Sequence, residues 1–362
     1  MGVLSKLLVD TLGLRIHRAT CYEMVHTWNP DCYGAIADSL RDGWLFSFKT
    51  YIIVYGLTSI FSVKDIREIR WRKILTDSVR SSFFLMTNLI IFLWLMCQFR
   101  KMLGFFTVPT LGLTSGLISA LLAIWIENRR RRPLLALYLT NLASETAYHQ
   151  LVNHGYLRYI PNGTVVIFGI GLAGLLHLYC RDKLHISLRK SIECPGRQRS
   201  LRIKMEASAH DLGKNLKEQV SRCGYSWCTN QTSPLSFCGA VGGLSLFFYP
   251  NISIAMYVFW KFVEGLFFSY YKKLVIPYGD IILYALSTSY IAWNAVIEPH
   301  TLRDGYWKFL VGLTGNRIEL LNRQLFDIFG YNSSKKFPGF VPKLDPNFSS
   351  IHDMCSVASP SS

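Results

Sequence analysis

The stretch SSFFLMTNLIIFLWLMCQF (residues 81–99) decides the class of this chain. It holds no acidic or basic residue, and its length is close to the roughly 20 apolar residues that a helix needs to cross a bilayer core. The composition agrees, because 50% of the 362 residues are hydrophobic and 17% are charged, whereas soluble domains contain about 25% charged residues. We therefore expect a helical membrane protein.

Other apolar segments accompany this one along the chain. They are residues 44–63, 104–126, 133–152, 163–180, 235–249, 251–271 and 279–297. Together the segments predict an all-α membrane protein with about eight candidate transmembrane helices. The segment 133–152 is only half apolar, because it carries Asn141, Glu145 and His149.

Changes in composition divide the chain around these segments. The predicted parts are an N-terminal cysteine-containing cap (1–42), the first two spans (43–103), repeat half one (104–180), a basic linker (181–234), repeat half two (235–297) and an amphipathic C-terminal tail (298–362). If all segments cross, the positive-inside rule places the basic connections in the cytosol, although the basic tail then falls on the other side. The formal net charge of +16 points to anionic lipid headgroups as partners, and no nucleic-acid-binding motif is present.

An internal repeat relates the two halves. Each half has a Gly-rich segment, a segment with one Glu and a third apolar segment, in the same order on either side of the linker. The best-matched stretches are LALYLTNLASETAY (135–148) and SIAMYVFWKFVEGLFF (253–268). Identical residues that align between them are Ala136 with Ala255, Tyr138 with Tyr257, and Glu145 with Glu264. The expected fold is therefore two repeated three-span halves after two N-terminal spans.

Glycines four residues apart predict where helices pack together. Gly112 and Gly116 precede the Glu-bearing segment of the first half, and Gly239 and Gly243 precede that of the second. Lipid gives helices little hydrophobic drive to pair, so small residues that let two backbones approach mark the packed faces. The GxGxxG pattern of residues 169–174 indicates packing too, because no strand precedes it.

Glu145 and Glu264 are the candidate functional residues within the spans. A charged side chain at the middle of a span costs about 2.5–3.5 kcal/mol, so it needs a polar cavity or a partner. Asn141 and His149 lie one turn from Glu145, and Lys261 lies one turn before Glu264. Two interpretations stay open: a polar groove for a bound or translocated substrate, and a polar clamp between helices.

The stretch CYEMVHTWNPDC (21–32) brackets a histidine with two cysteines. Cys21, His26 and Cys32 are soft ligands, but their spacing is not a standard zinc pattern and a structural zinc needs four ligands. Further candidates for a fourth ligand are His17, Cys223 and Cys228. The nine cysteines are scattered and odd in number, which argues against a disulfide framework. We expect a packed cap here, with no metal and no cofactor. The sequence contains no nucleophile–base set that would indicate an enzyme.

Several stretches resemble the transmembrane protein 135 family, also described as a peroxisomal membrane protein family. CYEMVHTWNPDC resembles the N-terminal signature of that family. Stretches that resemble its later blocks, in the right order, are RKMLGFFTVPTLGLTSG (100–116), IENRRRRPLLALYLTNLASETAY (126–148), DIILYALSTS (280–289), TLRDGYWKFLVGLTGNRIELLNRQLFDIFG (301–330) and FPGFVPKLDPNF (337–348). The resemblance covers most of residues 21–348 and assigns no metal to the cysteines.

The resemblance implies a multi-pass protein of peroxisomal and mitochondrial membranes. It links the chain to mitochondrial fission, peroxisome organisation and lipid metabolism, with membrane lipids and organelle-dynamics proteins as partners. The repeated segments are also similar to Tim-type subunits of mitochondrial inner-membrane translocases. The alternative is a translocation or lipid and sterol transfer device in which Glu145 and Glu264 line one polar groove.

Overall fold

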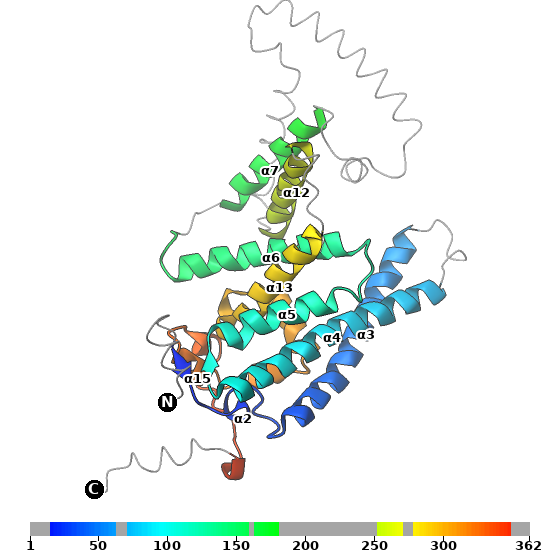
Figure 1. The fold of residues 1–362 in the computed structure, drawn as a ribbon. Coiled ribbons are helices and arrows are strands. Elements are labelled where there is room, and N and C mark those ends of the chain that lie inside the picture. The colour runs from blue at the N-terminus through cyan, green and yellow to red at the C-terminus, as the bar shows by residue number, and fades with distance from the viewer. Residues whose placement is uncertain (1–14, 63–70, 159–162, 181–251, 271–277, 349–362) are drawn as a thin grey trace, which may run out of the picture. The chain divides into compact units, whose positions relative to one another are not determined.

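The structure is a computed structural model that describes residues 15–62, 71–158, 163–180, 252–270 and 278–348. These residues are mostly helical (Figure 1), as the sequence predicts. Their one sheet is a short antiparallel pair, in which β1 (Ile16–His17) lies beside β2 (Phe106–Thr107). The predicted linker 181–234 and the predicted span 235–249, with Gly239 and Gly243, lie outside the described residues.

The described apolar segments lie within helices, although α3 and α4 extend beyond them and the segment 104–126 is divided. The α-helices are α2 (Cys21–Met24), α3 (Cys32–Ser62), α4 (Trp71–Leu103), α5 (Thr114–Ala123), α6 (Arg132–Asn153), α7 (Gly163–Cys180), α12 (Ile252–Tyr270), α13 (Gly279–Ile297), α14 (Asp304–Leu313) and α15 (Arg323–Asp327). Short helical turns are η2 (Pro109–Leu113), η4 (Pro299–Thr301), η5 (Arg317–Leu320), η6 (Ser333–Lys336) and η7 (Pro346–Phe348). Proline begins several of these elements, because its missing N–H is not needed in a first turn.

The expectation of about eight spans needs correction. Among the described helices, α4 and α13 are long and apolar enough to cross a membrane. The segment 104–126 is instead divided: Gly104 has a left-handed backbone (φ +80°), and α5 that follows η2 is only 10 residues long. The segment 133–152 does form α6, but its polar residues lower its hydropathy. Within the described residues, the apolar runs therefore predict more spans than the helices support.

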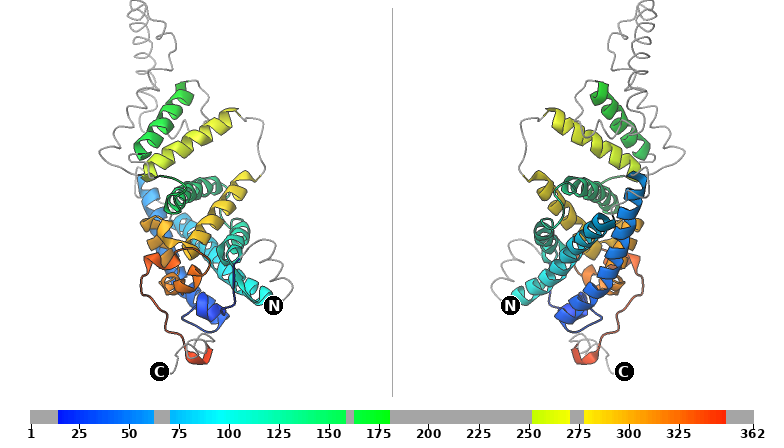
Figure 2. Two further views of the ribbon diagram at one scale, coloured as in Figure 1. Left: turned by 90° about the vertical axis from the view of Figure 1, so that its left-hand side faces the viewer. Right: turned by 90° about the vertical axis from the view of Figure 1, so that its right-hand side faces the viewer.

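The chain divides into two compact units, Met1–Leu157 with Tyr278–Ser362, and Arg158–Pro277. In the first unit α13 is the central helix, and α5 and α6 pack against it. Helices α3 and α4 pack on each other, and their ribbons cross at an angle in Figure 1; Figure 2 gives two further views. In the second unit the described elements are α7 and α12, which pack on each other through Leu175, Leu178 and Phe262.

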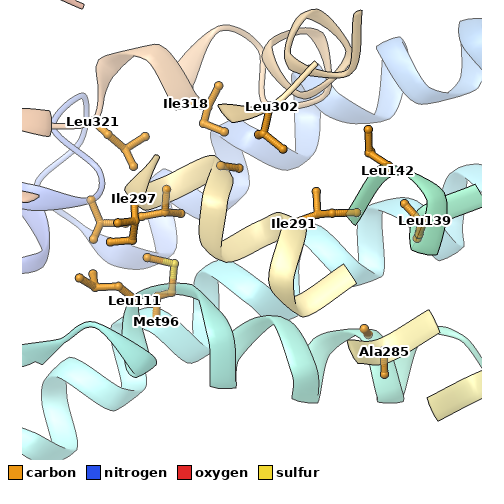
Figure 3. Close-up of a cluster of buried hydrophobic side chains, with 14 of the residues drawn as sticks. Met96, Leu111, Leu139, Leu142, Ala285, Ile291, Ile297, Leu302, Ile318 and Leu321 are labelled. Carbon is orange, nitrogen blue, oxygen red and sulfur yellow. The ribbon is translucent and has the colours of Figure 1, made fainter. Parts of the chain in front are cut away.

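One hydrophobic core contains residues from both chain segments of the first unit. Figure 3 shows Met96 of α4 and Leu111 of η2 gathered with Ile297 of α13. The C-terminal segment, residues 298–348, contributes buried side chains to the same core: Leu302, Trp307, Ile318, Leu321, Phe326 and Phe329. The amphipathic pattern after residue 298 thus has its apolar face inside the fold.

A buried arginine closes the end of α13. Arg323 is 1% exposed and donates hydrogen bonds to the carbonyl oxygens of Val296 at 2.6 Å, Ala295 at 3.3 Å and Ile318 at 3.1 Å. The Ser333 hydroxyl donates to the carbonyl of Ile297. The last carbonyls of a helix have no partner within the helix, so these donors allow α13 to end inside the core.

Glycines bring helices into backbone contact. A Cβ added to Gly112 would lie 2.6 Å from the Cα of Trp293, and one added to Gly116 would lie 3.0 Å from the Cα of Ser289. In the second unit, a Cβ on Gly171 would lie 2.8 Å from the Cα of Phe259. These approaches are closer than side chains permit and place small residues at the packed faces of α13 and α12.

Each packed pair combines one helix from each predicted half of the repeat. The repeat relates α6 to α12 and α7 to α13. In the first unit the Glu-bearing α6 packs on α13, and in the second unit the Glu-bearing α12 packs on α7. The aligned Ala136 and Ala255 are both buried, whereas the aligned Tyr138 and Tyr257 are both exposed. These two aligned positions therefore have the same burial in each pair, whereas the aligned Glu145 is buried and Glu264 is only half-buried.

We predict that Gly112→Ala destabilises the protein. The added methyl group meets the Trp293 backbone, which cannot turn away, and overpacking of this kind costs about 1–3 kcal/mol. Gly56→Ala is the matched control, because no heavy atom lies within 4 Å of its added Cβ and alanine favours helix over glycine by about 1 kcal/mol. Thermal unfolding in detergent should give a lower midpoint for the first variant only. Equal midpoints would contradict the close approach of η2 and α13.

Candidate functional site

Four side chains of the N-terminal region converge in one cluster. The sulfur atoms of Cys21, Cys32 and Cys97 and a ring nitrogen of His26 all lie within 4.8 Å of one another. His26 is 3% exposed and Cys97 is buried, while Cys21 and Cys32 are half-buried. None of these cysteines forms a disulfide. The structure thus joins the sequence candidates Cys21, His26 and Cys32 to a residue from α4.

Helix starts position two of the cysteines. Cys21 begins α2, where Thr20 and Glu23 form a capping box: the Glu23 N–H donates to the Thr20 hydroxyl at 3.2 Å and the Thr20 N–H donates to the Glu23 carboxylate at 2.7 Å. Cys32 begins α3, and the Asp31 carboxylate accepts the Gly34 N–H at 2.7 Å. Both caps fix the backbone beside a sulfur atom.

Hydrogen bonds orient the His26 ring. Its Nδ1 lies 2.8 Å from the carbonyl oxygen of Asn29, and its Nε2 lies 3.3 Å from the sulfur of Cys32. A carbonyl oxygen only accepts, so Nδ1 carries the proton and donates it. When the ring is neutral, the lone pair of Nε2 faces the Cys32 sulfur.

Arg100 ties the end of α4 to the residues just before Cys21. Its Nε donates to the carbonyl oxygen of Ala19 at 2.7 Å, and its Nη2 donates to that of Arg18 at 2.8 Å. The pairing of β1 with β2 adds a second link between the same two parts of the chain. These contacts hold Cys97, which lies one turn before Arg100, against the N-terminal cap.

Contacts within the cluster shift the pKa values of its members. Hydrogen bonds from Cys21, Cys97 and His26 hold the pKa of the Cys32 thiol well below its ordinary value. Burial opposes a charge on His26, but hydrogen bonds to Cys21 and Cys32 outweigh it and raise the pKa of His26 to about 10. A cavity of about 390 Å³ beside the cysteines is lined by Arg100 and Lys101, whose charge favours thiolate.

The other ligand candidates do not join the described cluster. The Nδ1 of His17 accepts the Ala19 N–H at 3.1 Å, and Cys223 and Cys228 lie outside the described residues. Sequence reasoning missed Cys97, because a cysteine in an apolar segment reads as a small hydrophobic residue. Only the packing of α4 against the N-terminal cap reveals it.

The carboxylates predicted to be functional have cationic partners. Glu145 is 3% exposed and binds Arg303, with the Nε of Arg303 3.2 Å from Oε1 and a second bond from Nη2 to Oε2. The Nζ of Lys261 lies 2.7 Å from Oε2 of Glu264. Glu145 and Glu264 belong to different units.

The neighbours of Glu145 on α6 make other contacts. Asn141 is buried, and its Oδ1 has no hydrogen-bond partner. The His149 ring packs against the ring of Tyr148, with centroids 5.8 Å apart. Among the described contacts, then, the charge of Glu145 is met by Arg303 from the C-terminal segment.

Sequence reasoning also missed two buried carboxylates. Glu127, 2% exposed, accepts the Ser81 hydroxyl at 3.0 Å and pairs with Arg131 at 3.4 Å. Glu298, also 2% exposed, accepts Gln150 at 2.7 Å and pairs with His154 at 2.8 Å. Both stand in connections between helices, where a charge looks solvated from the sequence.

An apolar cavity of about 130 Å³ lies between α4, α13 and α14. Its lining includes Phe92, Ile291 and Phe309. Pockets for drug-sized ligands measure about 300–1,000 Å³, so the cavity in this conformation holds only a small part of a lipid or sterol.

These features define a helical protein with candidate membrane spans and a cysteine-rich N-terminal region. Residues 18–152 match the family model of the N-terminal cysteine-rich region of Transmembrane protein 135, and this part of the chain is such a region. It includes Cys21, His26, Cys32 and Cys97. No solved structure matches the chain.

The Glu145–Arg303 pair predicts that mutating its two members lowers stability by different amounts. Arg303→Met leaves a buried carboxylate without its cation, which costs about 3–5 kcal/mol. Glu145→Gln costs less, about 1–2 kcal/mol, because the Arg303 side chain is 27% exposed and reaches water. Arg41→Met is the control, since Arg41 meets Asp42 with its own side chain 81% exposed. Denaturant unfolding of purified variants measures the differences, and equal losses at all three positions would refute this role.

Proposed function

We propose that the chain is a non-catalytic, multi-pass protein of peroxisomal and mitochondrial membranes that acts in mitochondrial fission, peroxisome organisation and lipid metabolism. The observation that carries the proposal is the match of residues 18–152 to the Transmembrane protein 135 cysteine-rich region. The resemblance of later stretches to the same family supports it, since they extend the likeness to residue 348.

Exposed apolar side chains support a membrane location. Only 28% of the apolar stretch of α4 is buried, against 56% for α13. Large apolar side chains exposed on α3, α4 and α13 are Leu45, Ile53, Val54, Leu57, Ile60, Leu75, Val79, Phe83, Trp94, Ile282, Leu283 and Leu286. Monomers in water rarely expose contiguous apolar surface on this scale, and lipid chains would cover it.

Paired charges support a role without catalysis. A catalytic acid or base needs a site where it reaches a substrate. The buried carboxylates of the described residues are already engaged: Glu127 with Arg131, Glu145 with Arg303, Glu298 with His154, and Glu23 with the Thr20 N–H. Such pairs hold helices and connections in place, which suits a scaffold or regulator.

The alternative is a translocation or lipid transfer device built on the repeat. Matched packing of α6 on α13 and of α12 on α7 favours it, because transporters are commonly built from internal repeats. A groove that works through charge needs Glu145 and Glu264 ionised and facing a substrate. The pairing of Glu145 with Arg303 from the C-terminal segment supports the clamp instead, so we keep transfer as the second proposal.

We predict that the chain resists extraction from membranes by alkaline carbonate. Leu286, 55% exposed on α13, tests the lipid contact: Leu286→Arg places a charge near the middle of the span at a cost of about 2.5–3.5 kcal/mol. Val341→Arg is the control, because Val341 is 65% exposed outside the helices. The first variant should insert poorly and the second normally. Normal insertion of both would mean that this face of α13 does not meet lipid.

The proposed role predicts rescue in cells that lack their own family member. The wild-type chain should restore peroxisome number and mitochondrial length, and so should the Glu145→Gln, Glu264→Gln double variant, because an amide still bonds Arg303 and Lys261. The measurement is organelle imaging at matched protein abundance. Asp304→Asn is the control, since its carboxylate is 89% exposed. Failure of the double variant alone would favour the transfer device, and failure of the wild type would reject the proposed function.

A further inference from the structure

We propose that Cys21, His26, Cys32 and Cys97 bind one Zn²⁺ ion that fastens the N-terminal cap to α4. The site goes beyond the proposed function and is independent of it. It also departs from the packed, metal-free cap expected from the sequence. The reason for the change is Cys97, which supplies the fourth ligand that the N-terminal stretch lacks.

The donor set and its dimensions suit a structural zinc. Three thiolates and one imidazole form one of the common tetrahedral zinc sites, with Zn–S near 2.3 Å and Zn–N near 2.0–2.1 Å. Ligand atoms around such an ion stand about 3.6–3.8 Å apart. The four ligand atoms here lie within 4.8 Å of one another, with Nε2 of His26 at 3.3 Å from Cys32. Contraction by about 1 Å around an ion completes the tetrahedron.

The surroundings of the ligands fit the same conclusion. A zinc-bound histidine usually donates its other ring N–H to a carbonyl or carboxylate, which fixes the ring. His26 does this through Nδ1, which bonds the Asn29 carbonyl at 2.8 Å. Arg100 plays a similar supporting role for Cys97, because it bonds the carbonyls of residues 18 and 19.

Charge is balanced at the site. A divalent ion with three thiolates and a neutral imidazole carries one net negative charge. Cys32 stands at the N-terminus of α3, where the helix dipole stabilises negative charge. Arg100 and Lys101 line the adjoining cavity and add positive charge nearby. The cavity also gives an ion a route to the cysteines.

Two alternatives, a disulfide and simple packing, each explain fewer of the observed atom positions. A disulfide joins two sulfur atoms and leaves the third sulfur and the oriented Nε2 of His26 without a role. Packing alone does not require the Nε2 of a nearly buried imidazole to lie 3.3 Å from one sulfur within a group of three. One ion uses all four atoms at once.

The bond pattern assigns the ion a structural task. Cys21, His26 and Cys32 lie close in sequence, whereas Cys97 is distant, so the ion would close a long loop between the cap and α4. Metal binding of this kind contributes directly to folding. With all four positions filled by protein ligands, no coordination site remains for a substrate.

The test is metal analysis of the full-length protein purified in detergent without added metal or chelator. Elemental analysis should give one zinc per chain, and X-ray absorption at the zinc edge should show three sulfur neighbours and one nitrogen neighbour. Because this spectrum uses the wild-type chain, it does not depend on any variant folding. Absence of zinc, zinc bound by oxygen, or a mass showing a disulfide among Cys21, Cys32 and Cys97 would each overturn the proposal.

Variants then assign the ligands. Cys97→Ser and His26→Ala should lose most of the zinc, whereas His26→Cys should keep it with four sulfur neighbours. His17→Ala is the control, because His17 lies in the described N-terminal region but is not one of the four clustered ligands, and it should keep one zinc per chain. Full zinc content in the Cys97→Ser chain would overturn the assignment of the fourth ligand.

Discussion

The fold of the first unit depends on the hydrogen bonds that the last carbonyl oxygens of α13 accept. A helix that ends inside a core leaves carbonyl oxygens that need donors, and water is excluded there. Arg323 and Ser333 supply those donors from the C-terminal segment. Burial lowers the pKa of Arg323 to about 9, so it stays charged at neutral pH, and the rings of Trp307 and Phe337 lie beside it. Without this segment α13 could not be the central helix.

The same segment also meets the N-terminal cap. The Thr27 hydroxyl donates to the carbonyl of Leu320 at 2.6 Å, the Asn322 N–H donates to the carbonyl of Met24 at 3.2 Å, and Tyr22 accepts the Asp345 N–H at 2.9 Å. The cap, the end of α13 and the C-terminal segment are therefore one assembly. The cysteine cluster adds α4 to it, so both candidate spans are held by residues that lie outside the repeat.

Sequence patterns predicted the helices well where a long apolar run dominates, as in α4 and α13, because periodicity and length are local properties. They failed where partners are distant. Among the described residues, Cys97 becomes a candidate ligand only through its proximity to Cys21, and Glu145 is paired only by the distant Arg303. The apolar face of the C-terminal segment is buried only by the core. No spacing rule links these residues. Within the described residues the number of spans was overstated for a related reason: protein buries some apolar segments and lipid buries others, and their composition does not distinguish the two.

The two aligned carboxylates show how a repeat can keep a charge and change its partner. Glu264 takes its cation from Lys261, one turn earlier on the same helix. The position that corresponds to Lys261 in the first half is Leu142, which is 1% exposed and belongs to the core. Since α6 cannot place a cation there without losing that packing, its carboxylate is met by Arg303 from outside the repeat. The first-half helix is thereby bound to the C-terminal segment, whereas the ion pair of α12 lies within α12 alone.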